Sequence, residues 1–404
     1  MWQELVAPYV DSGVLAVVGV VQEQHPDRAR LYEQWKRLGW PIFVDSLNLL
    51  GIKVVPVPVA LDASGVVRGA PISPGRFVSG FLEQDYPAGG AADPRLLSDK
   101  PDVAQARKRA ESTNNASDWL AVGDAHFLRH GGPTDLDAAI EAYRRVVAAD
   151  PADGKAEFRL GVALRRRYES GRGRPGDAQA AVDHWVSALA IDPNQYIWRR
   201  RIQQYGPRLD KPYNFYFWIE KAKQEILARG EEPVRLAIPP TGSELAPPER
   251  RSSGDASLRI PNPDPEGRIA RDTKRLVTTD VVTTPGRVRP GRRVRVRVTL
   301  RLNERTTPYW NNEYKGLLLS VTPPVGFTIT EGEFKYPNVS KPETREVRRL
   351  EFEVEVSKNT PPGTLDLPAY AIYDVCEDAG GVCRHLRQDF TVRIVVDPSA
   401  PKIQ

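Results

Sequence analysis

The stretch RVRVRVTLRL, residues 293–302, alternates apolar side chains with arginine or threonine over ten positions. A second alternation, RLEFEVEV at residues 349–356, carries glutamates where the first carries arginines. Successive side chains of a strand point to opposite faces, so both stretches predict strands with one apolar face toward a core. If the two strands are neighbours, opposite charges face each other across them, and each such pair contributes about 0.2–1 kcal/mol.

Further strand candidates surround these two in the C-terminal third of the chain, and Gly and Pro turns separate them. They cover residues 275–283, 316–322, 327–336, 366–375 and 388–396. Many short strands divided by turn signals indicate an antiparallel sandwich of the immunoglobulin-like type. We therefore predict a β-sandwich over residues 269–404.

Only two cysteines occur in the 404 residues, Cys376 and Cys383. A predicted strand leads into Cys376, and a Gly-rich loop returns the chain so that Cys383 can face it. A disulfide closing so short a loop would stabilise the sandwich by about 2.5 kcal/mol. Two roles stay open for the pair, a structural disulfide or idle reduced pair on one hand and a redox-active pair on the other.

The context of these cysteines resembles a known family. The segments LPAYAIYDVCEDAGGVC, QDFTVRIVV and LLLSVTPPVGFTITEGEFKYP are similar to the N-terminal periplasmic domain of the DsbD thiol:disulfide interchange proteins. The resemblance covers about residues 270–397 and implies that Cys376 and Cys383 are a redox-active pair on a hairpin. In that family the pair accepts electrons from a membrane domain and passes them to thioredoxin-like partners.

The residues around the pair leave the reactivity of the thiols open. Arg384-His385-Leu386 stands where the family has a proline-containing segment. Asp374, Glu377 and Asp378 would raise the pKa of the thiols, whereas Arg384 and His385 would lower it.

The N-terminal region predicts a small α/β sheet. An apolar run at residues 14–21 precedes a helical pattern from Arg28 to Leu38, a second strand at 41–45, and a hairpin. The hairpin segment GIKVVPVPVALDASGVVRG resembles the thioredoxin and redoxin (AhpC/TSA) families, with Pro56 at the position of the cis-proline that faces the active-site dithiol. We predict a partial thioredoxin-like domain at residues 1–85.

This domain lacks the chemistry of the family that it resembles. Thioredoxins need a Cys-x-x-Cys, and peroxiredoxins a single thiolate, at the start of a helix. No cysteine precedes Cys376. Neither thioredoxin nor peroxidase activity is therefore expected from residues 1–85.

The middle of the chain contains a helical repeat. Ala139, Tyr143, Val146 and Pro151 are spaced like Ala181, Trp185, Ala188 and Pro193, a shift of about 42 residues. Gly123 falls in the first helix of one unit, and the pattern resembles tetratricopeptide (TPR) repeats. We predict a TPR-like helical array at residues 117–230, between a linker at 86–116 and a Pro-rich linker at 231–268.

The composition and the motifs argue against several classes of partner, site and cofactor. With 57 basic against 52 acidic residues the surface is mixed, so a nucleic-acid partner is not expected. No apolar run is long enough for a membrane span, and the five histidines lack metal-ligand spacing. No cofactor is predicted, because neither a phosphate-binding Gly-rich loop nor a Gly-x-Ser-x-Gly elbow occurs.

The start of the chain bears on its location. Met1-Trp2-Gln3-Glu4 carries no export signal, so the chain as written is expected in the cytoplasm. A truncated N-terminus would instead allow the periplasm.

Together these features predict a multidomain α+β protein of a bacterial thiol-disulfide redox system. The TPR-like segment would bind a protein partner, and Cys376 and Cys383 would exchange a disulfide, so the chain is a candidate thiol-disulfide oxidoreductase. The alternative is a non-catalytic scaffold for protein–protein interaction in which the cysteines form a structural disulfide.

Overall fold

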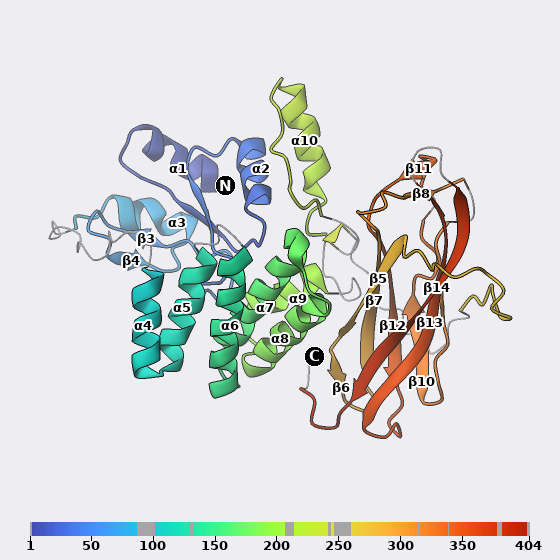
Figure 1. Ribbon diagram of the computed structural model, residues 1–404. Coiled ribbons are helices and arrows are strands. Elements are labelled where there is room, and N and C mark those ends of the chain that lie inside the picture. The colour runs from blue at the N-terminus through green and yellow to red at the C-terminus, as the bar shows by residue number, and fades with distance from the viewer. Residues whose placement is uncertain are drawn as a thin grey trace. The chain divides into compact units, whose positions relative to one another are not determined.

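A computed structural model of the chain shows a mixed α+β protein (Figure 1). It describes residues 2–86, 102–128, 133–206, 214–240, 244–245, 260–313, 316–337, 339–377 and 382–401. Contacts divide the chain into two compact units. The N-terminal unit comprises Met1–Arg174, Ile191–Arg199 and Phe217–Pro239, and the C-terminal unit comprises Pro175–Ala190, Arg200–Tyr216 and Pro240–Gln404.

The N-terminal unit begins with short strands and helices around a small apolar core. The elements are α1 (Trp2–Asp11), β1 (Gly19–Val21), α2 (Pro26–Lys36), β2 (Ile42–Val44), β3 (Ala60–Leu61), β4 (Val67–Gly69) and α3 (Pro74–Phe77), with a π-helical turn at Val78–Leu82. Proline fits the first turn of α2, where its missing N–H costs no hydrogen bond. β3 and β4 form an antiparallel hairpin, as the sequence predicted. β1 and β2 form a separate parallel sheet, so the described strands make two small sheets where one partial thioredoxin-type sheet was expected.

The β1–β2 sheet has one open apolar face. Val20 lies opposite Phe43 in the parallel register, and these side chains are 46% and 61% exposed. Leu15 and Val17, which precede β1, pack against the core around Val6. Parallel strands are normally covered on both faces, so this pair of strands is incompletely covered within the described residues.

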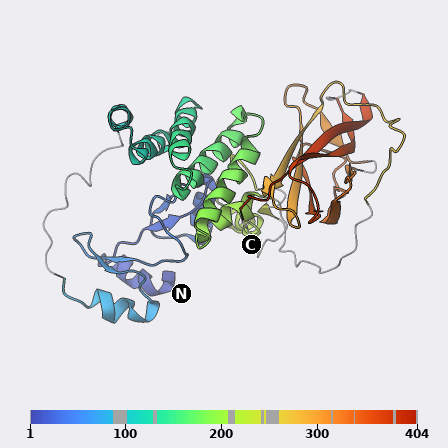
Figure 2. The ribbon, with the colours of Figure 1, turned by 90° about the horizontal axis from the view of Figure 1, so that it is seen from below.

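Four helices of the N-terminal unit lie side by side in sequence order (Figures 1 and 2). They are α4 (Val103–Thr113), α5 (Ala116–Leu128), α6 (Pro133–Ala149) and α7 (Gly154–Arg167), the last continued by a π-helical turn at Tyr168–Arg172. Asp102 and Asp153 cap α4 and α7 by accepting backbone N–H hydrogen bonds. At Gly123 a Cβ would lie 2.3 Å from the Tyr143 ring, so only glycine allows α5 and α6 to approach this closely.

The remaining helices are α8 (Asp177–Ile191), α9 (Tyr196–Tyr205) and α10 (Trp218–Ala228), of which α10 packs against α2. The apolar positions of the 42-residue repeat are all fully buried. These are Ala139, Tyr143, Val146, Ala181, Trp185 and Ala188. The periodicity therefore marks buried helix faces.

Both predicted linkers contain ordered, packed residues. α4 begins inside the stretch 86–116, and its Ala110 is buried against α5. In the stretch 231–268, the Ala237 N–H donates a 2.6 Å hydrogen bond to Asp27 of α2. The sequence predicted a linker with one poorly packed helix in the first stretch and a stiff, partly extended linker in the second. The helix is present, and contacts such as these pack parts of both stretches. Residues 87–101 and 246–259 lie outside the described residues.

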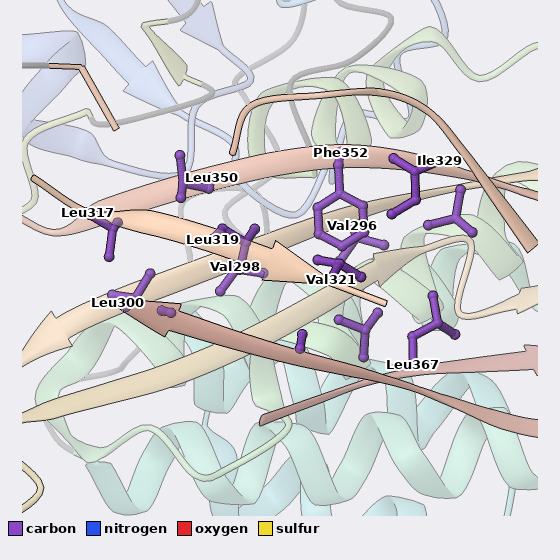
Figure 3. Packing of buried hydrophobic residues seen from close by; sticks show 14 of the residues in the cluster. Val296, Val298, Leu300, Leu317, Leu319, Val321, Ile329, Leu350, Phe352 and Leu367 are labelled. Atoms are coloured by element: carbon purple, nitrogen blue, oxygen red, sulfur yellow. The ribbon is translucent and has the colours of Figure 1, made fainter. Parts of the chain in front are cut away.

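The C-terminal unit contains two sheets that share one apolar core. Their strands are β5 (Val277–Thr284), β6 (Arg287–Val288), β7 (Arg293–Leu302), β8 (Tyr309–Asn311), β9 (Leu318–Val321), β10 (Phe327–Gly332), β11 (Glu343–Thr344), β12 (Arg348–Val356), β13 (Gly363–Cys376) and β14 (Cys383–Val396). One sheet has the order β10-β12-β7-β5, and the other the order β11-β8-β13-β14-β6 with β9 on β13. Val296 and Phe352 from the first sheet and Leu319 and Leu367 from the second meet between them (Figure 3).

The two alternating stretches are antiparallel neighbours, as their charges suggested. Arg297 of β7 lies opposite Glu351 of β12, and Arg293 lies opposite Glu355. Arg297 and Glu351 form a 2.7 Å ion pair whose side chains are almost fully buried. The apolar face of β7 is buried, as predicted for a half-buried strand. On its polar face Arg297 and Thr299 are buried as well, whereas Arg293 is exposed and Arg295 and Arg301 are partly buried.

Candidate functional site

The candidate site lies at the end of the β13–β14 hairpin. These two strands pair over fourteen positions, from Gly363 opposite Val396 to Cys376 opposite Cys383. The inward residues of this ladder, such as Leu367 and Val392, are fully buried. The apolar alternation thus fixes the register that places the two cysteines opposite each other.

Cys376 and Cys383 are joined by a disulfide, with their Cα atoms 3.9 Å apart. Cys376 is 1% exposed and also pairs across the sheet with Tyr309 of β8. Cys383 begins β14 and is exposed. The disulfide therefore has one covered half and one half that is open to solvent.

The charged residues beside the cysteines pair with one another. Glu377 accepts hydrogen bonds from Lys274 at 2.8 Å and from Arg384 at 2.8 Å, and these cations hold the pKa of Glu377 below its usual value. Asp374 lies 2.8 Å from Nδ1 of His385. Glu377 is therefore paired with two cations, whereas the second oxygen of Asp374, Oδ2, is buried with no hydrogen-bond partner among the described residues. Asp378 lies outside the described residues.

Two buried aromatic side chains, Tyr373 and Trp310, pack beside the end of β13 that carries Cys376. Tyr373 is fully buried, and its hydroxyl donates a 2.9 Å hydrogen bond to Asp272. The ring of Trp310 meets Tyr373 edge-on at 5.8 Å, and the indole N–H donates to the Glu346 carbonyl. Burial, with the Asp272 carboxylate, raises the pKa of Tyr373 far above its usual value, so this phenol does not titrate.

Pro56 lies in the N-terminal unit, after the β1-α2-β2 segment. The Val55–Pro56 peptide bond is cis, as are Ala70–Pro71 and Thr284–Pro285. Pro56 is exposed. Because no cysteine precedes Cys376, no thiol from residues 1–85 can face this proline.

A cavity of about 630 Å³ opens on the sandwich beside β13 and β14. Arg387 lies in its wall, 3.7 Å above the ring of Tyr370, and forms ion pairs with Asp264 at 2.8 Å and Asp389 at 2.6 Å. The lining thus holds three carboxylates, with Glu266 the third, and one guanidinium. Arg271 and Arg268, beside the cavity, pair with Asp389 and Glu266.

A buried polar cluster that the sequence patterns did not predict surrounds His25. This side chain lies between Glu23 and Glu169, at 3.4 Å and 2.9 Å. The available signal was the polar run QEQHPD at residues 22–27, between a strand and a helix. Among the described residues, no three His, Cys, Asp or Glu side chains form a metal-binding group. His130 lies outside them.

Within the described ranges, no helix has the length and apolar character needed to cross a membrane. This agrees with the sequence, which contains no apolar run of that kind.

Comparisons with known proteins give no family for the chain. No family model matches it, and no curated protein matches it. Weak structural similarity links parts of the chain to AvmM, which catalyses macrocyclization in alchivemycin A biosynthesis (12% identity, 31% of this chain, 92% of that chain, TM-score 0.18). A second similar structure is AggA, the major subunit of aggregative adherence fimbriae type I from Escherichia coli (13% identity, 30% of this chain, 95% of that chain, TM-score 0.17). A third is a type I cohesin–dockerin complex from Clostridium thermocellum (13% identity, 30% of this chain, 99% of that chain, TM-score 0.17). Scores this low establish no shared function.

Proposed function

We propose that the chain is a thioredoxin-like, TPR-containing protein of a bacterial thiol-disulfide redox system and exchanges a disulfide at Cys376 and Cys383. The observation that carries this proposal is the asymmetry of the disulfide. Cys383 is exposed at the start of β14, whereas Cys376 is buried at the end of β13. An incoming thiolate can approach Cys383 along the line of the sulfur–sulfur bond only if that half is open.

The exchange needs a partner that carries two thiols. A partner thiolate attacks Sγ of Cys383, the bond between Cys376 and Cys383 breaks, and Cys376 leaves as a thiolate that takes up a proton. The second partner thiolate then attacks the partner's own sulfur in the mixed disulfide and releases Cys383, which is protonated in turn. The partner loses two electrons and two protons to the cysteine pair, and the reverse sequence oxidises the pair.

Charge pairing around the hairpin supports this chemistry. Lys274 and Arg384 both contact Glu377. They offset the charge of Glu377, which would otherwise oppose the formation of a thiolate on Cys383.

We assign partner binding to the TPR-like helices. The close approach of α5 and α6 at Gly123 and Tyr143 is the packing expected where a small residue faces an aromatic side chain between paired helices. Such arrays bind protein segments along a helix face.

A scaffold with a structural disulfide is the second candidate. The burial of Cys376 and its place in a continuous fourteen-residue ladder favour it, because a covered sulfur in a paired strand is a poor leaving group. In that case the helices and the sandwich would both bind proteins without chemistry.

Thiol reactivity separates the two candidates. In Cys376→Ser the remaining Cys383 should react with a chromogenic aromatic disulfide and form a mixed disulfide with glutathione, detectable by mass spectrometry. The matched variant Cys383→Ser leaves only buried Cys376 and should react at least about tenfold more slowly. Equal and slow reaction of both variants would remove the exchange proposal and leave the scaffold.

A further inference from the structure

Helix α7 is covered on all its sides. Of its fourteen residues, only Lys155 and Arg166 are not buried. A helix at the surface of a bundle normally keeps one polar face in water. The polar face of α7, which carries Arg159 and Arg165, is instead buried within the N-terminal unit.

The chain itself covers this face with the loops that follow β1 and β2. Arg159 donates to the carbonyl of Leu47 at 3.4 Å, and Arg166 donates to the carbonyl of Gln24 at 3.0 Å. Gln24 also donates to the carbonyl of Val162 at 3.4 Å. Residues 159, 162, 166 and 169 recur at helical spacing, so the loops run along one face of α7 and its continuation.

His25 fastens the first of these loops to the end of α7. Its Nε2 lies 2.9 Å from Glu169, its Nδ1 lies 3.4 Å from Glu23, and the side chain is 3% exposed. A neutral imidazole has one N–H and one lone pair, so it can donate to only one of two carboxylates. Both contacts are favourable only when the ring is the doubly protonated imidazolium.

The charged groups around the ring favour that form. Burial alone would lower the pKa of His25, but Glu169 and Glu23 outweigh it and raise the pKa, against a smaller opposing effect of Arg28. Burial likewise opposes the charge of Glu169, yet Arg165 at 2.6 Å and His25 lower the pKa of Glu169 to about 2. Asp27 lies in the first turn of α2, and Arg166 of α7 donates to the carbonyl of Gln24, the residue before His25.

We propose that His25, Glu23 and Glu169 form a proton-dependent latch that holds the chain's own loops on α7 and keeps this helix face from other partners. Loss of the His25 proton breaks one of the two carboxylate contacts and lets residues 22–28 leave the helix. The latch involves neither cysteine, so it stands or falls apart from the exchange chemistry.

The direction of the pH effect follows from the sign of the shift. Because the folded-state pKa of His25 is raised, the latch is fully closed below the ordinary histidine pKa of about 6.5. It opens as the pH rises through the raised value. An alkaline change, not an acidic one, should therefore expose α7.

Amide hydrogen exchange on the full chain tests the latch. Between about pH 6 and about pH 9, and after correction for intrinsic exchange rates, protection of residues 22–28 should fall at least about tenfold, the equivalent of one pKa unit. His25→Gln keeps a donor but cannot titrate, so its protection should not change with pH. His385→Gln, at an exposed histidine with one carboxylate partner, is the matched control and should behave like the unmodified chain.

A second variant keeps the latch testable if His25→Gln does not fold. Glu169→Gln removes one carboxylate and should move the loss of protection to lower pH, while nitrogen NMR of the unmodified chain should show both His25 ring nitrogens protonated at neutral pH. A neutral His25 ring at neutral pH, or the same pH response in His25→Gln, would overturn the latch.

Discussion

The β1–β2 pair and the β13–β14 pair differ in the contacts that stabilise them. β1 and β2 pair over three residues and leave Phe43 on an open face. β13 and β14 pair over fourteen residues and bury Leu367 and Val392 in a shared core. The first pair depends on the loops and helices packed beside it, whereas the second is stabilised by its own ladder and sandwich. The disulfide exchange that we propose at Cys376 and Cys383 requires a geometry that persists while a bond breaks, and the long ladder of β13 and β14 would provide it.

The unfolding free energy should change most when a side chain of the sandwich core is removed. Trp310→Ala deletes a fully buried ring between β13 and its neighbours and should cost about 3–5 kcal/mol of unfolding free energy. Phe43→Ala, on the open face of β2, should change it by less than about 0.5 kcal/mol. Chemical denaturation monitored by circular dichroism measures both, and a similar cost for the two would contradict the comparison.

Breaking the disulfide should have the next largest effect. Replacing both Cys376 and Cys383 by Ser should lower the unfolding free energy of the sandwich by about 2.5 kcal/mol, because the unfolded chain gains the entropy of a short loop. The transition of the N-terminal unit should not move. A shift of both transitions would show that the hairpin stabilises more than its own sandwich.

Gly123→Ala tests how closely helices α5 and α6 of the N-terminal unit pack. Its Cβ would overlap the Tyr143 ring, so α5 and α6 must separate, at a cost of about 1–3 kcal/mol. Gly75→Ala is the control, since a Cβ there meets nothing within 4 Å. Thermal unfolding reports both variants, and an unchanged melting temperature for Gly123→Ala would mean that the two helices are not closely packed.

The smallest effect is expected on the outer face of the hairpin. Arg393 and Asp366 form a 2.9 Å ion pair between β14 and β13 with largely exposed side chains. Arg393→Ala should cost less than about 1 kcal/mol, and added salt should reduce even that difference. A larger loss in denaturation experiments would show that this part of the ladder depends on its surface charges.

Sequence patterns predicted the sandwich better than the N-terminal unit, for a physical reason. The alternations in β7 and β12 predicted the two faces of each strand, and opposite charges across them if the strands were neighbours, because the period of a strand acts on every residue. The structure supplies the pairing itself, with Arg297 opposite Glu351. The start of β14 was placed at 388 although it begins at Cys383, since the polar residues there carry no alternation. Burial of Arg297 could not be predicted, because it depends on a segment distant in the chain, that of Tyr205.

The cysteine pair and the His25 cluster also differ in how much of each the sequence could predict. Cys376 and Cys383 are close in the chain, and their pairing followed from a strand and a loop. His25 and Glu169 are separated by 144 residues, so no local pattern connects them. Contacts of that kind become visible only when the fold brings the segments together.

The reduction potential of the Cys376–Cys383 pair tests the central claim most directly. The full chain would be equilibrated with glutathione buffers of graded ratio, and its free thiols counted after acid quenching. We predict a reduction midpoint above about −300 mV, within the range that exchanging pairs occupy. A pair that stays oxidised in every buffer, or that never oxidises, would contradict disulfide exchange at this hairpin.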